Sequence, residues 1–241
     1  MNYSDITIND PNRIKRYLQQ SRYRTAVDVY PKHPHRKQVL DFGGGDGELC
    51  LQLSAKDQES SFLCYEPALH MQAQAEAKIG SLERIRLIDN LEALEPDSCD
   101  VVYSLEVFEH LPPAEFGDAI EQIFRILRPG GKLIIGVPNE LFLAAIYKGI
   151  FRMLRRFGDH DARPWNILRC ALGRPPKNRP TGEISPGKKY HFHHLGFDHR
   201  DLRRVLNLKG GPVQRVLSPT WLLGGFMSPE IYYIAEKGTD K

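Results

Sequence analysis

A glycine-rich turn constrains the fold of this chain more than any other stretch of its sequence. Residues 38–53 hold a short apolar run that ends at Asp41, and apolar residues return at helical spacing from Leu49. Between them stand four glycines, namely Gly43, Gly44, Gly45 and Gly47. This order predicts a strand, a tight turn and a helix. Glycine is needed where the chain reverses sharply and where a ligand approaches the bare backbone.

The spacing of these glycines decides which ligand the turn suits. A dinucleotide-binding turn that began with Gly43 and Gly45 would need its third glycine at position 48, where the chain has Glu48. A phosphate-binding P-loop would need a lysine after its last glycine, and none follows here. The pattern that fits is D-x-G-x-G-x-G, beginning at Asp41. A purely structural turn between strand and helix is the alternative.

Composition limits the size, location and partners of the protein. A chain of 241 residues with 41% hydrophobic content suits one α/β domain, with or without an insertion. The net charge of +3 is too small to argue for nucleic acid. Four cysteines without a C-x-x-C pair are typical of reduced thiols, and the start of the chain has no apolar secretory signal. We therefore expect a cytoplasmic protein without a transmembrane span.

Alternating strand and helix signals predict parallel βαβ units with both faces of the sheet covered. The chain begins with a helix of about residues 11–29, in which Asp10 is the N-cap and Pro11 the first helical residue. Strands are expected at 38–42, 61–66, 84–89, 100–105 and 132–137, and helices at 47–56, 68–79 and 113–127. A ligand should lie at the carboxyl ends of the strands at 38–42 and 100–105.

The alternation breaks between Pro138 and about Gly211. After it we expect a helix at 199–207 and strands at 213–218 and 230–236. The two strands leave no room for a helix between them, which predicts an antiparallel hairpin at the edge of the sheet. Residues 174–187 are rich in proline and glycine and are expected to form a loop.

At Asp41–Gly47 the sequence resembles the first motif of the class I S-adenosylmethionine (SAM)-dependent methyltransferases. Two later segments, SLEVFEHL at 104–111 and LRPGGKL at 127–133, are similar to the small-molecule methyltransferases of ubiquinone and menaquinone biosynthesis. Pro138-Asn139 also resembles that family. Together these matches cover residues 38–139, about 40% of the chain, in the same order and spacing as in the family.

The resemblance implies an α/β fold and a cofactor. The fold would be a Rossmann-like, seven-stranded, mostly parallel sheet with helices on both faces and its last strand antiparallel. SAM would be the methyl donor and S-adenosylhomocysteine the product. The turn amides and the helix N-terminus would receive the SAM carboxylate, and Asp41 would face its ammonium group. The cofactor-binding residues would be Asp41, Gly43, Gly44, Gly45, Gly47, Glu66, Pro67, Asp89, Asn90, Leu105 and Glu106.

Acidic residues at the ends of two strands refine this site. Glu66 ends the second strand, nineteen positions after Gly47, where a carboxylate can accept both ribose hydroxyls. In the resembling family, an acidic residue at the place of Asp89 binds the adenine amino group. The alternatives are an ordinary acidic strand end for Glu66 and a turn-forming pair for Asp89 and Asn90.

Histidines are the candidates for catalysis. His110 could cap the local loop, line the methionine pocket or act as a general base. Methyl transfer needs a base only when the acceptor is a weak nucleophile such as a hydroxyl, because the sulfonium already activates the methyl group. His191, His193 and His194 are expected to border the acceptor or to make local hydrogen bonds. No cysteine or paired carboxylate completes a ligand set with these three, so we expect no metal.

The acceptor side of the protein is expected in a basic insertion at residues 140–211. This stretch holds fifteen Lys and Arg against six Asp and Glu, although the whole chain carries only +3. The imbalance favours an anionic small-molecule acceptor. Residues 141–157 form a basic amphipathic pattern, which predicts a helix that either packs on the sheet edge or meets a membrane surface at the inner face.

The sequence therefore predicts four parts: an N-terminal helical cap at 1–37, a SAM-binding core at 38–139, the insertion at 140–211 and a C-terminal β-hairpin at 212–241. The predicted function is SAM-dependent methyl transfer to a small molecule, such as an anionic or lipid-linked sugar or glycan intermediate. An RNA methyltransferase and a non-catalytic SAM-fold binding protein are the rival hypotheses. The chain has no appended RNA-binding module and no N-P-P-Y-type tetrapeptide after the strand at 100–105, so nucleic acid is the less favoured partner. The oligomeric state is not indicated.

Overall fold

The structure is a computed structural model, and it describes residues 12–31, 37–185, 187–219 and 224–239. Its core elements are α2 (Arg13–Asp28), β1 (Gln38–Phe42), α3 (Glu48–Lys56), β2 (Ser61–Tyr65), α4 (Leu69–Ile79), β3 (Ile85–Ile88), β4 (Cys99–Leu105), η1 (Phe108–His110), α5 (Pro113–Ile126) and β5 (Leu127–Pro138). Then come α6 (Phe142–Arg156), η2 (His160–Ala162), α7 (Pro164–Ala171), β6 (Thr181–Ser185), β7 (Lys188–His191), α8 (His199–Gly210), β8 (Gln214–Ser218), α9 (Gly224–Met227) and β9 (Glu230–Glu236).

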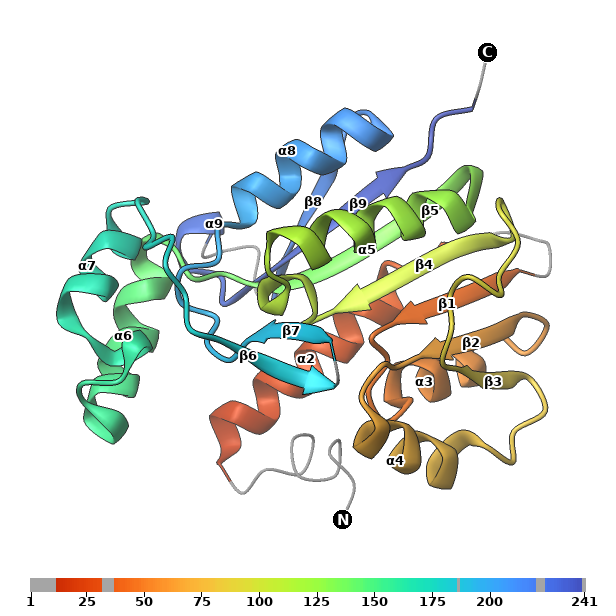
Figure 1. Cartoon of the computed structure of the whole chain (residues 1–241), viewed down its shortest axis with the longest axis horizontal. Coiled ribbons are helices and arrows are strands. Elements are labelled where there is room, and N and C mark those ends of the chain that lie inside the picture. Colours follow the sequence, from red (N-terminus) through yellow and green to blue (C-terminus); the bar gives the residue numbers. More distant parts are fainter. Residues whose placement is uncertain (1–11, 32–36, 186, 220–223, 240–241) are drawn as a thin grey trace.

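Seven strands form one sheet in the order β3-β2-β1-β4-β5-β9-β8, which confirms the predicted fold class (Figure 1). The pairs from β3 to β5 are parallel, and β9 runs antiparallel to both β5 and β8. The strand order reverses between β1 and β4, because β2 and β3 extend the sheet on one side and β4 and β5 on the other. Ligands of doubly wound sheets bind at the carboxyl ends of strands beside such a reversal.

Helices cover both faces of the sheet, and each face has its own apolar core (Figure 1). On one face, side chains of α5 and α8 such as Ile123 and Leu206 pack on strand residues including Val102. On the other face, α2, α3 and α4 contribute Ala26, Leu53 and other buried side chains. Because both faces are buried, the central strands read as continuous apolar runs rather than alternating ones.

The starts of two predicted elements differ from the structure, and one helix was not predicted. The N-cap of α2 is Asn12, whose side chain accepts hydrogen bonds from the amides of Ile14 and Lys15, and not the expected Asp10. Asp10 and Pro11 lie outside the described residues. The fifth strand begins at Leu127 rather than at residue 132, with a register shift opposite Cys99. A four-residue helix, α9, separates the last two strands, where no room for a helix was expected.

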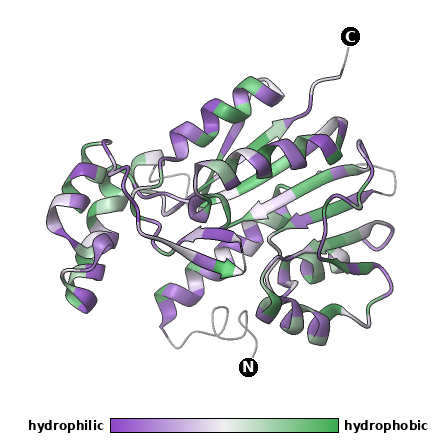
Figure 2. Ribbon diagram, in the orientation of Figure 1, coloured by the Kyte–Doolittle hydropathy of each residue, from purple (hydrophilic) through white to green (hydrophobic). Residues whose placement is uncertain are grey.

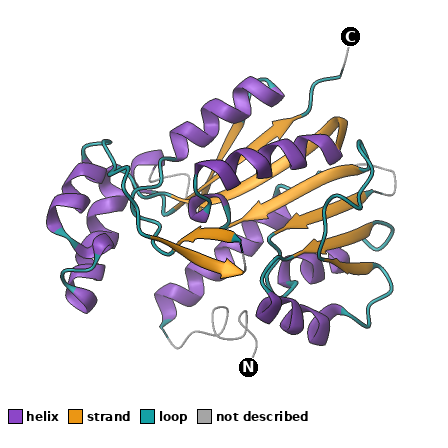
Figure 3. Cartoon of the chain, viewed as in Figure 1, coloured by secondary structure: helices purple, strands orange, loops and turns teal. Residues whose placement is uncertain are grey.

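The stretch at 140–211 forms three pieces of structure, one of which is α8 on the face of the sheet. Helices α6 and α7 project from one end of the sheet, whereas strands β6 and β7 form a separate two-stranded hairpin near the carboxyl ends of β1 and β4 (Figures 1 and 3). The hairpin corrects the prediction of a loop at 174–187. Pro180 and Gly187 flank its first strand rather than interrupt it, and Thr181 pairs with His191 in an antiparallel register.

The predicted amphipathic helix at 141–157 is confirmed as α6, which begins at Phe142 and ends at Arg156. Among the helices that the structure describes, none is long and apolar enough to cross a membrane. The basic side chains of α6 pair partly within the protein, because Lys148 and Arg152 bind the fully buried Glu140.

Candidate cofactor and acceptor site

The glycine turn after β1 is packed too tightly for side chains. Gly43, Gly45 and Gly47 have φ angles of 76°, 59° and 80°, a region that L side chains rarely adopt. A Cβ atom on Gly47 would lie 2.4 Å from Cδ1 of Ile79, and one on Gly43 would lie 2.4 Å from Cγ2 of Val107. The predicted strand, turn and helix are therefore confirmed, and the glycines serve both backbone conformation and close packing.

The turn amides bind the end of β2 rather than standing free. The amides of Gly43 and Gly44 donate to the carbonyl oxygen of Tyr65 at 2.8 and 2.9 Å. The amide of Gly45 donates to the carboxylate of Glu66 at 2.9 Å, and the amide of Ala68 donates to its other oxygen at 2.8 Å. The amides of Gly45 and Ala68 thus hold the Glu66 carboxylate in place. Binding of the SAM carboxylate by the turn and the N-terminus of α3 stays a prediction.

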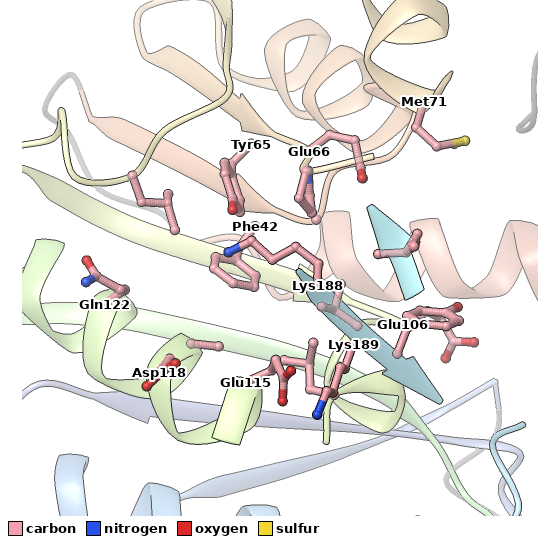
Figure 4. A pocket seen from close by; sticks show the side chains of 18 of the residues that line it. Phe42, Tyr65, Glu66, Met71, Glu106, Glu115, Asp118, Gln122, Lys188 and Lys189 are labelled. Carbon is pink, nitrogen blue, oxygen red and sulfur yellow. The ribbon is translucent and has the colours of Figure 1, made fainter. Parts of the chain in front are cut away.

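A cavity of about 420 Å³ opens beside this turn, at the carboxyl ends of β1 and β4 (Figure 4). Its volume is in the range of small-molecule and cofactor sites. Its walls come from β1, β2, the loop after β4, α4, α5 and the β6–β7 hairpin. The lining residues are Phe42, Gly43, Tyr65, Glu66, Pro67, His70, Met71, Leu91, Glu106, Val107, Leu111, Glu115, Asp118, Ala119, Gln122, Ile184, Lys188, Lys189 and Tyr190.

The cavity combines an apolar wall with carboxylates. Phe42, Leu91 and Leu111 supply apolar surface, which suits a flat ring such as adenine. Four carboxyl side chains also line it, and they are Glu66, Glu106, Glu115 and Asp118 (Figure 4). An excess of carboxylates favours a ligand with positive charge, as in a sulfonium and an ammonium group.

Four of the predicted cofactor residues line this cavity: Gly43, Glu66, Pro67 and Glu106. Three other predicted glycines, Gly44, Gly45 and Gly47, belong to the same turn but are not among the residues that line the cavity. Asp41 is 3% exposed beneath the turn and also does not line the cavity. Burial, with the nearby carboxylates of Glu66 and Asp46, raises the pKa of Asp41 to about 7.

The remaining predicted cofactor residues lie outside the cavity lining. Asp89 and Asn90 are exposed at the end of β3, and Asn90 accepts a hydrogen bond from the amide of Glu92 at 2.8 Å. Such a bond is typical of the turn-forming alternative for Asn90. Leu105 packs against Gly136 on β5, because a Cβ atom on Gly136 would lie 2.8 Å from Cδ2 of Leu105. Adenine binding by Asp89 stays a prediction.

Glu106 directly follows β4 and has a strained backbone conformation. Its φ angle is 56°, which a non-glycine residue adopts only when the surroundings enforce it. Its amide donates to the carbonyl oxygen of Gly136, and its carboxylate lies 3.1 Å from the guanidinium of Arg22 on α2. Burial raises the pKa of Glu106 to about 7, although Arg22 opposes the shift. From this strained position Glu106 lines the cavity.

The four candidate histidines do not form one group. The rings of His110 and His194 lie edge to face with centroids 4.6 Å apart. His191 instead contacts the carbonyl oxygen of Pro180 at 3.1 Å, and Nδ1 of His193 lies 3.5 Å from Asp161. Burial lowers the pKa of His110 to about 4 and that of His194 well below its usual value. Both rings are therefore neutral at pH 7, and none of the four lines the cavity.

Several lining residues were missed from the sequence. Glu115, Asp118 and Gln122 recur at helical spacing on α5, which could have marked one polar face of that helix as a site wall. Ile184 and Lys188 reach the cavity only because their segments pair as a hairpin. No local sequence pattern in residues 174–187, which are rich in proline and glycine, predicted that pairing.

Comparison with known proteins agrees with this geometry. A Rossmann-like sheet with an antiparallel β9, a glycine turn after β1 and a carboxylate at the end of β2 agrees with a class I SAM-dependent methyltransferase. The sequence profile of the family described as "Methyltransferase domain" matches residues 13–176. The match covers more than half of the chain, and the protein therefore belongs to that family.

Individual relatives are more distant. An uncharacterized methyltransferase of Geobacillus thermodenitrificans is 33% identical over 97 residues, which are 40% of this chain and 44% of the relative. A ubiquinone biosynthesis O-methyltransferase of Xylella fastidiosa is 30% identical over 110 residues, or 44% of each chain. The chain thus matches less than half the length of these curated relatives.

Solved structures show the same fold. The 1,6-didemethyltoxoflavin-N1-methyltransferase of Burkholderia thailandensis, solved with S-adenosylhomocysteine, has a TM-score of 0.56 and 15% identity to this chain. The comparison covers 98% of this chain and 86% of that one. At this identity the likeness shows the fold alone.

Proposed function

We propose that this protein transfers a methyl group from SAM to an anionic small-molecule acceptor and releases S-adenosylhomocysteine. The observation that carries the proposal is the cavity beside the glycine turn, which joins an apolar wall, four carboxylates and two lysines in one space. The carboxylates suit the cationic cofactor, and Lys188 and Lys189 suit an anion. The family supplies the class of reaction, and the acceptor is inferred from the residues of this chain.

Glu66 is the residue proposed to bind the ribose of SAM. Each of its carboxylate oxygens already accepts one backbone hydrogen bond, from Gly45 and Ala68, which fixes the side chain before ligand arrives. A carboxylate oxygen has a second lone pair for a ribose hydroxyl. Because Glu66 is held by the main chain, little side-chain entropy is lost when the ribose binds.

The chemistry requires alignment more than acid–base groups. The sulfonium sulfur leaves with its electron pair while the methyl carbon bonds to the acceptor, so the protein must hold the three atoms in line. The β6–β7 hairpin lies over the cavity and is tied to the cofactor side by a hydrogen bond from Ser185 to the carbonyl oxygen of Pro67 at 3.1 Å. This contact connects the acceptor side to the turn that carries Glu66.

Lysines of the hairpin are proposed to bind the acceptor anion. Much of the charge of the insertion is used inside the protein, since Arg152 binds Glu140 and Arg200 binds Asp198. Lys188 and Lys189, by contrast, are exposed on β7 and line the cavity. Their ammonium groups are therefore available at the place where an acceptor would enter.

Calorimetric titration tests the cofactor part of this proposal. We expect SAM and S-adenosylhomocysteine to bind one site of the wild-type chain. Glu66→Ala and Gly45→Val should each weaken binding at least about tenfold, a loss of about 1.4 kcal/mol. Glu59→Ala, a change at an exposed residue outside the cavity, is the control and should bind as the wild type does. A wild-type chain that binds neither compound would contradict the proposal.

Labelled SAM tests the acceptor class. The purified protein is incubated with methyl-labelled SAM and a cell extract, which is then separated into small anions, lipids, glycans, RNA and protein. We expect label in an anionic small-molecule, glycan or lipid-linked fraction, and a higher acceptor KM in the Lys188→Gln, Lys189→Gln variant. Label in RNA would overturn the acceptor assignment in favour of an RNA methyltransferase. Binding of SAM without any transfer would favour a non-catalytic binding protein.

Helices α6 and α7 are proposed to touch the inner face of a membrane. Ten large apolar residues on or beside them are exposed: Leu143, Ile146, Tyr147, Ile150, Phe151, Leu154, Phe157, Trp165, Leu168 and Leu172. Leu154 is 82% exposed and Phe157 75% exposed, and Arg155 and Arg156 stand between them. Figure 2 shows hydrophobic and hydrophilic residues mixed along both helices. Apolar side chains flanked by arginines are typical of binding to anionic lipid surfaces.

Vesicle sedimentation tests this contact. Vesicles that contain phosphatidylglycerol should bring down the wild-type chain, and vesicles of pure phosphatidylcholine should bring down much less. A Leu154→Ser, Phe157→Ser variant should lose most of the binding. Leu208→Ser, at an equally exposed leucine on α8, should keep it. Equal sedimentation of both variants would contradict the assignment of this surface.

A further inference from the structure

A buried carboxylate and two imidazoles meet beside the cavity. One ligand-capable atom of each of Glu109, His110 and His194 lies within 4.8 Å of the corresponding atoms of the others. Glu109 and His110 belong to η1 after β4, and His194 lies in the segment between β7 and α8. Residues more than eighty positions apart are thus brought together by the packing of β7 against η1.

The carboxylate of Glu109 has no hydrogen-bond partner among the described residues. Its side chain is fully buried, and both of its oxygens are unpaired. Arg179, a nearby cation, donates to the backbone oxygen of Glu109 and to that of His193 rather than to the carboxylate. An unpaired buried carboxylate is costly by several kcal/mol if charged, so either a proton or a bound cation must neutralise it.

His110 is oriented as metal-binding histidines usually are. Its Nδ1 atom donates to the carbonyl oxygen of His191 at 2.6 Å, which leaves the lone pair of Nε2 free to bind. Nε2 lies 3.8 Å from Oε1 of Glu109. The ring is also held between Tyr190, stacked at 4.4 Å, and His194. In metal-binding histidines, the ring nitrogen that does not bind the metal generally makes such a hydrogen bond, which fixes the tautomer and the ring plane.

We propose that Glu109, His110 and His194 bind a divalent first-row transition cation, each through one atom. Two imidazoles with one carboxylate suit manganese, iron, cobalt or zinc better than magnesium or calcium, which prefer oxygen ligands alone. Three protein ligands leave coordination positions open, as catalytic rather than structural metal sites do. The expectation of no metal considered the histidines of 188–195 by themselves and did not include Glu109.

The site borders the cavity, because His110 stacks on Tyr190 and Tyr190 lines the cavity together with Glu106. An oxygen atom of the acceptor is therefore the class of ligand that we propose for an open position. This last step rests on the proposed function, whereas the metal site itself does not.

Cobalt is the probe that tests the metal site without SAM or an acceptor. The whole 241-residue chain is treated with EDTA, dialysed and titrated with Co²⁺, and visible absorption spectra report the ligand field of the bound ion. We expect one equivalent to bind with the spectrum of a nitrogen and oxygen site. Glu109→Gln and His194→Ala should weaken binding at least about tenfold. His193→Ala is the matched control, because His193 faces Asp161 and should leave binding unchanged.

Anomalous scattering at the cobalt edge from wild-type crystals gives a result that does not depend on the variants folding. The peak should lie among Glu109, His110 and His194. No binding, a peak elsewhere, or equal binding by well-folded Glu109→Gln would overturn the proposal. Because no step uses SAM, a failure here leaves the proposed methyl transfer standing, and loss of SAM binding would leave the metal site standing.

Discussion

The glycines of the turn differ in how closely other atoms surround them. Gly45 and Gly47 share a left-handed backbone, but a Cβ atom on Gly45 would come no closer than 3.4 Å, to the flexible end of Met71. On Gly47 it would meet the fully buried Ile79 at 2.4 Å. The sequence pattern treats all the glycines alike, and only the packing separates those that a side chain would disrupt.

Gly47→Ala should therefore destabilise the protein more than Gly45→Ala. Both changes carry about 1 kcal/mol of backbone strain, and overpacking at Ile79 adds about 1–3 kcal/mol for Gly47 alone. Urea unfolding of both variants measures the difference in the free energy of unfolding. Equal losses for the two variants would contradict the packing argument.

Asp41 should make the stability of the protein fall as the pH rises. Burial raises its pKa from 3.8 to about 7, so between these values the folded state holds a proton that the unfolded state has lost. Stability is thus lost progressively from about pH 4 to pH 7. The Asp41→Asn variant lacks this titrating group. Its free energy of unfolding should therefore rise relative to that of the wild type over that range, by on the order of a few kcal/mol.

Urea unfolding of the Asp41→Asn and wild-type chains at several pH values between 4 and 8 measures this difference. Other titrating groups are common to both chains and cancel. A gap that stays constant with pH would show that the side chain of Asp41 ionises normally.

Among the elements, α2 is joined to the sheet by a buried cation as well as by apolar packing. Arg22 binds Glu230 on β9 and Glu106 at the end of β4, and both carboxylates are largely buried. Arg22→Met should cost about 3–5 kcal/mol, because it leaves two buried carboxylates without their partner. Arg24→Met, at the exposed neighbour on the same helix, should change the free energy of unfolding by less than about 0.5 kcal/mol. Chemical denaturation of both variants checks the prediction, and similar losses would contradict it.

The β6–β7 hairpin should open and close more freely than the sheet below it. It is a separate two-stranded sheet, and isolated pairs of strands are only marginally stable. Trypsin should cleave after the exposed Lys188 or Lys189, and S-adenosylhomocysteine should slow that cleavage by filling the cavity that the hairpin covers. Mass spectrometry of the fragments gives the rates. The Glu66→Ala variant is the control, and it should show little protection at the same ligand concentration.

At the scale of the whole molecule, the fold was largely predictable and the acceptor side was not. The glycine turn and the apolar runs placed β1 to β4 and their helices correctly, because local periodicity there follows burial on both sheet faces, but they put the start of β5 too late. The neighbours of Glu109 could not be predicted, since His194 reaches it only through tertiary packing. The hairpin at 181–191 was missed for the same reason, as its breaker-rich composition is also that of loops.

Ligand binding should stabilise the whole domain as one unit, because the cavity draws its walls from β1, β2, α4, α5 and the hairpin. S-adenosylhomocysteine at a hundred times its Kd would add about 2.7 kcal/mol. For a chain of this size that corresponds to a rise in Tm of about 5–10 °C. Differential scanning calorimetry should show a single transition that moves as a whole, and a shift confined to a separate, smaller transition would contradict this picture.

The position of β9 in the sheet limits the order in which the last strands can pair during synthesis. β9 lies between β5 and β8 and forms hydrogen bonds to both, yet it follows them in the chain. During synthesis, β8 therefore has no place in the sheet until Glu236 has left the ribosome. For as long as translation runs through this region, the edge of β5 stays unpaired, and a chaperone that shields such edges would find its substrate there.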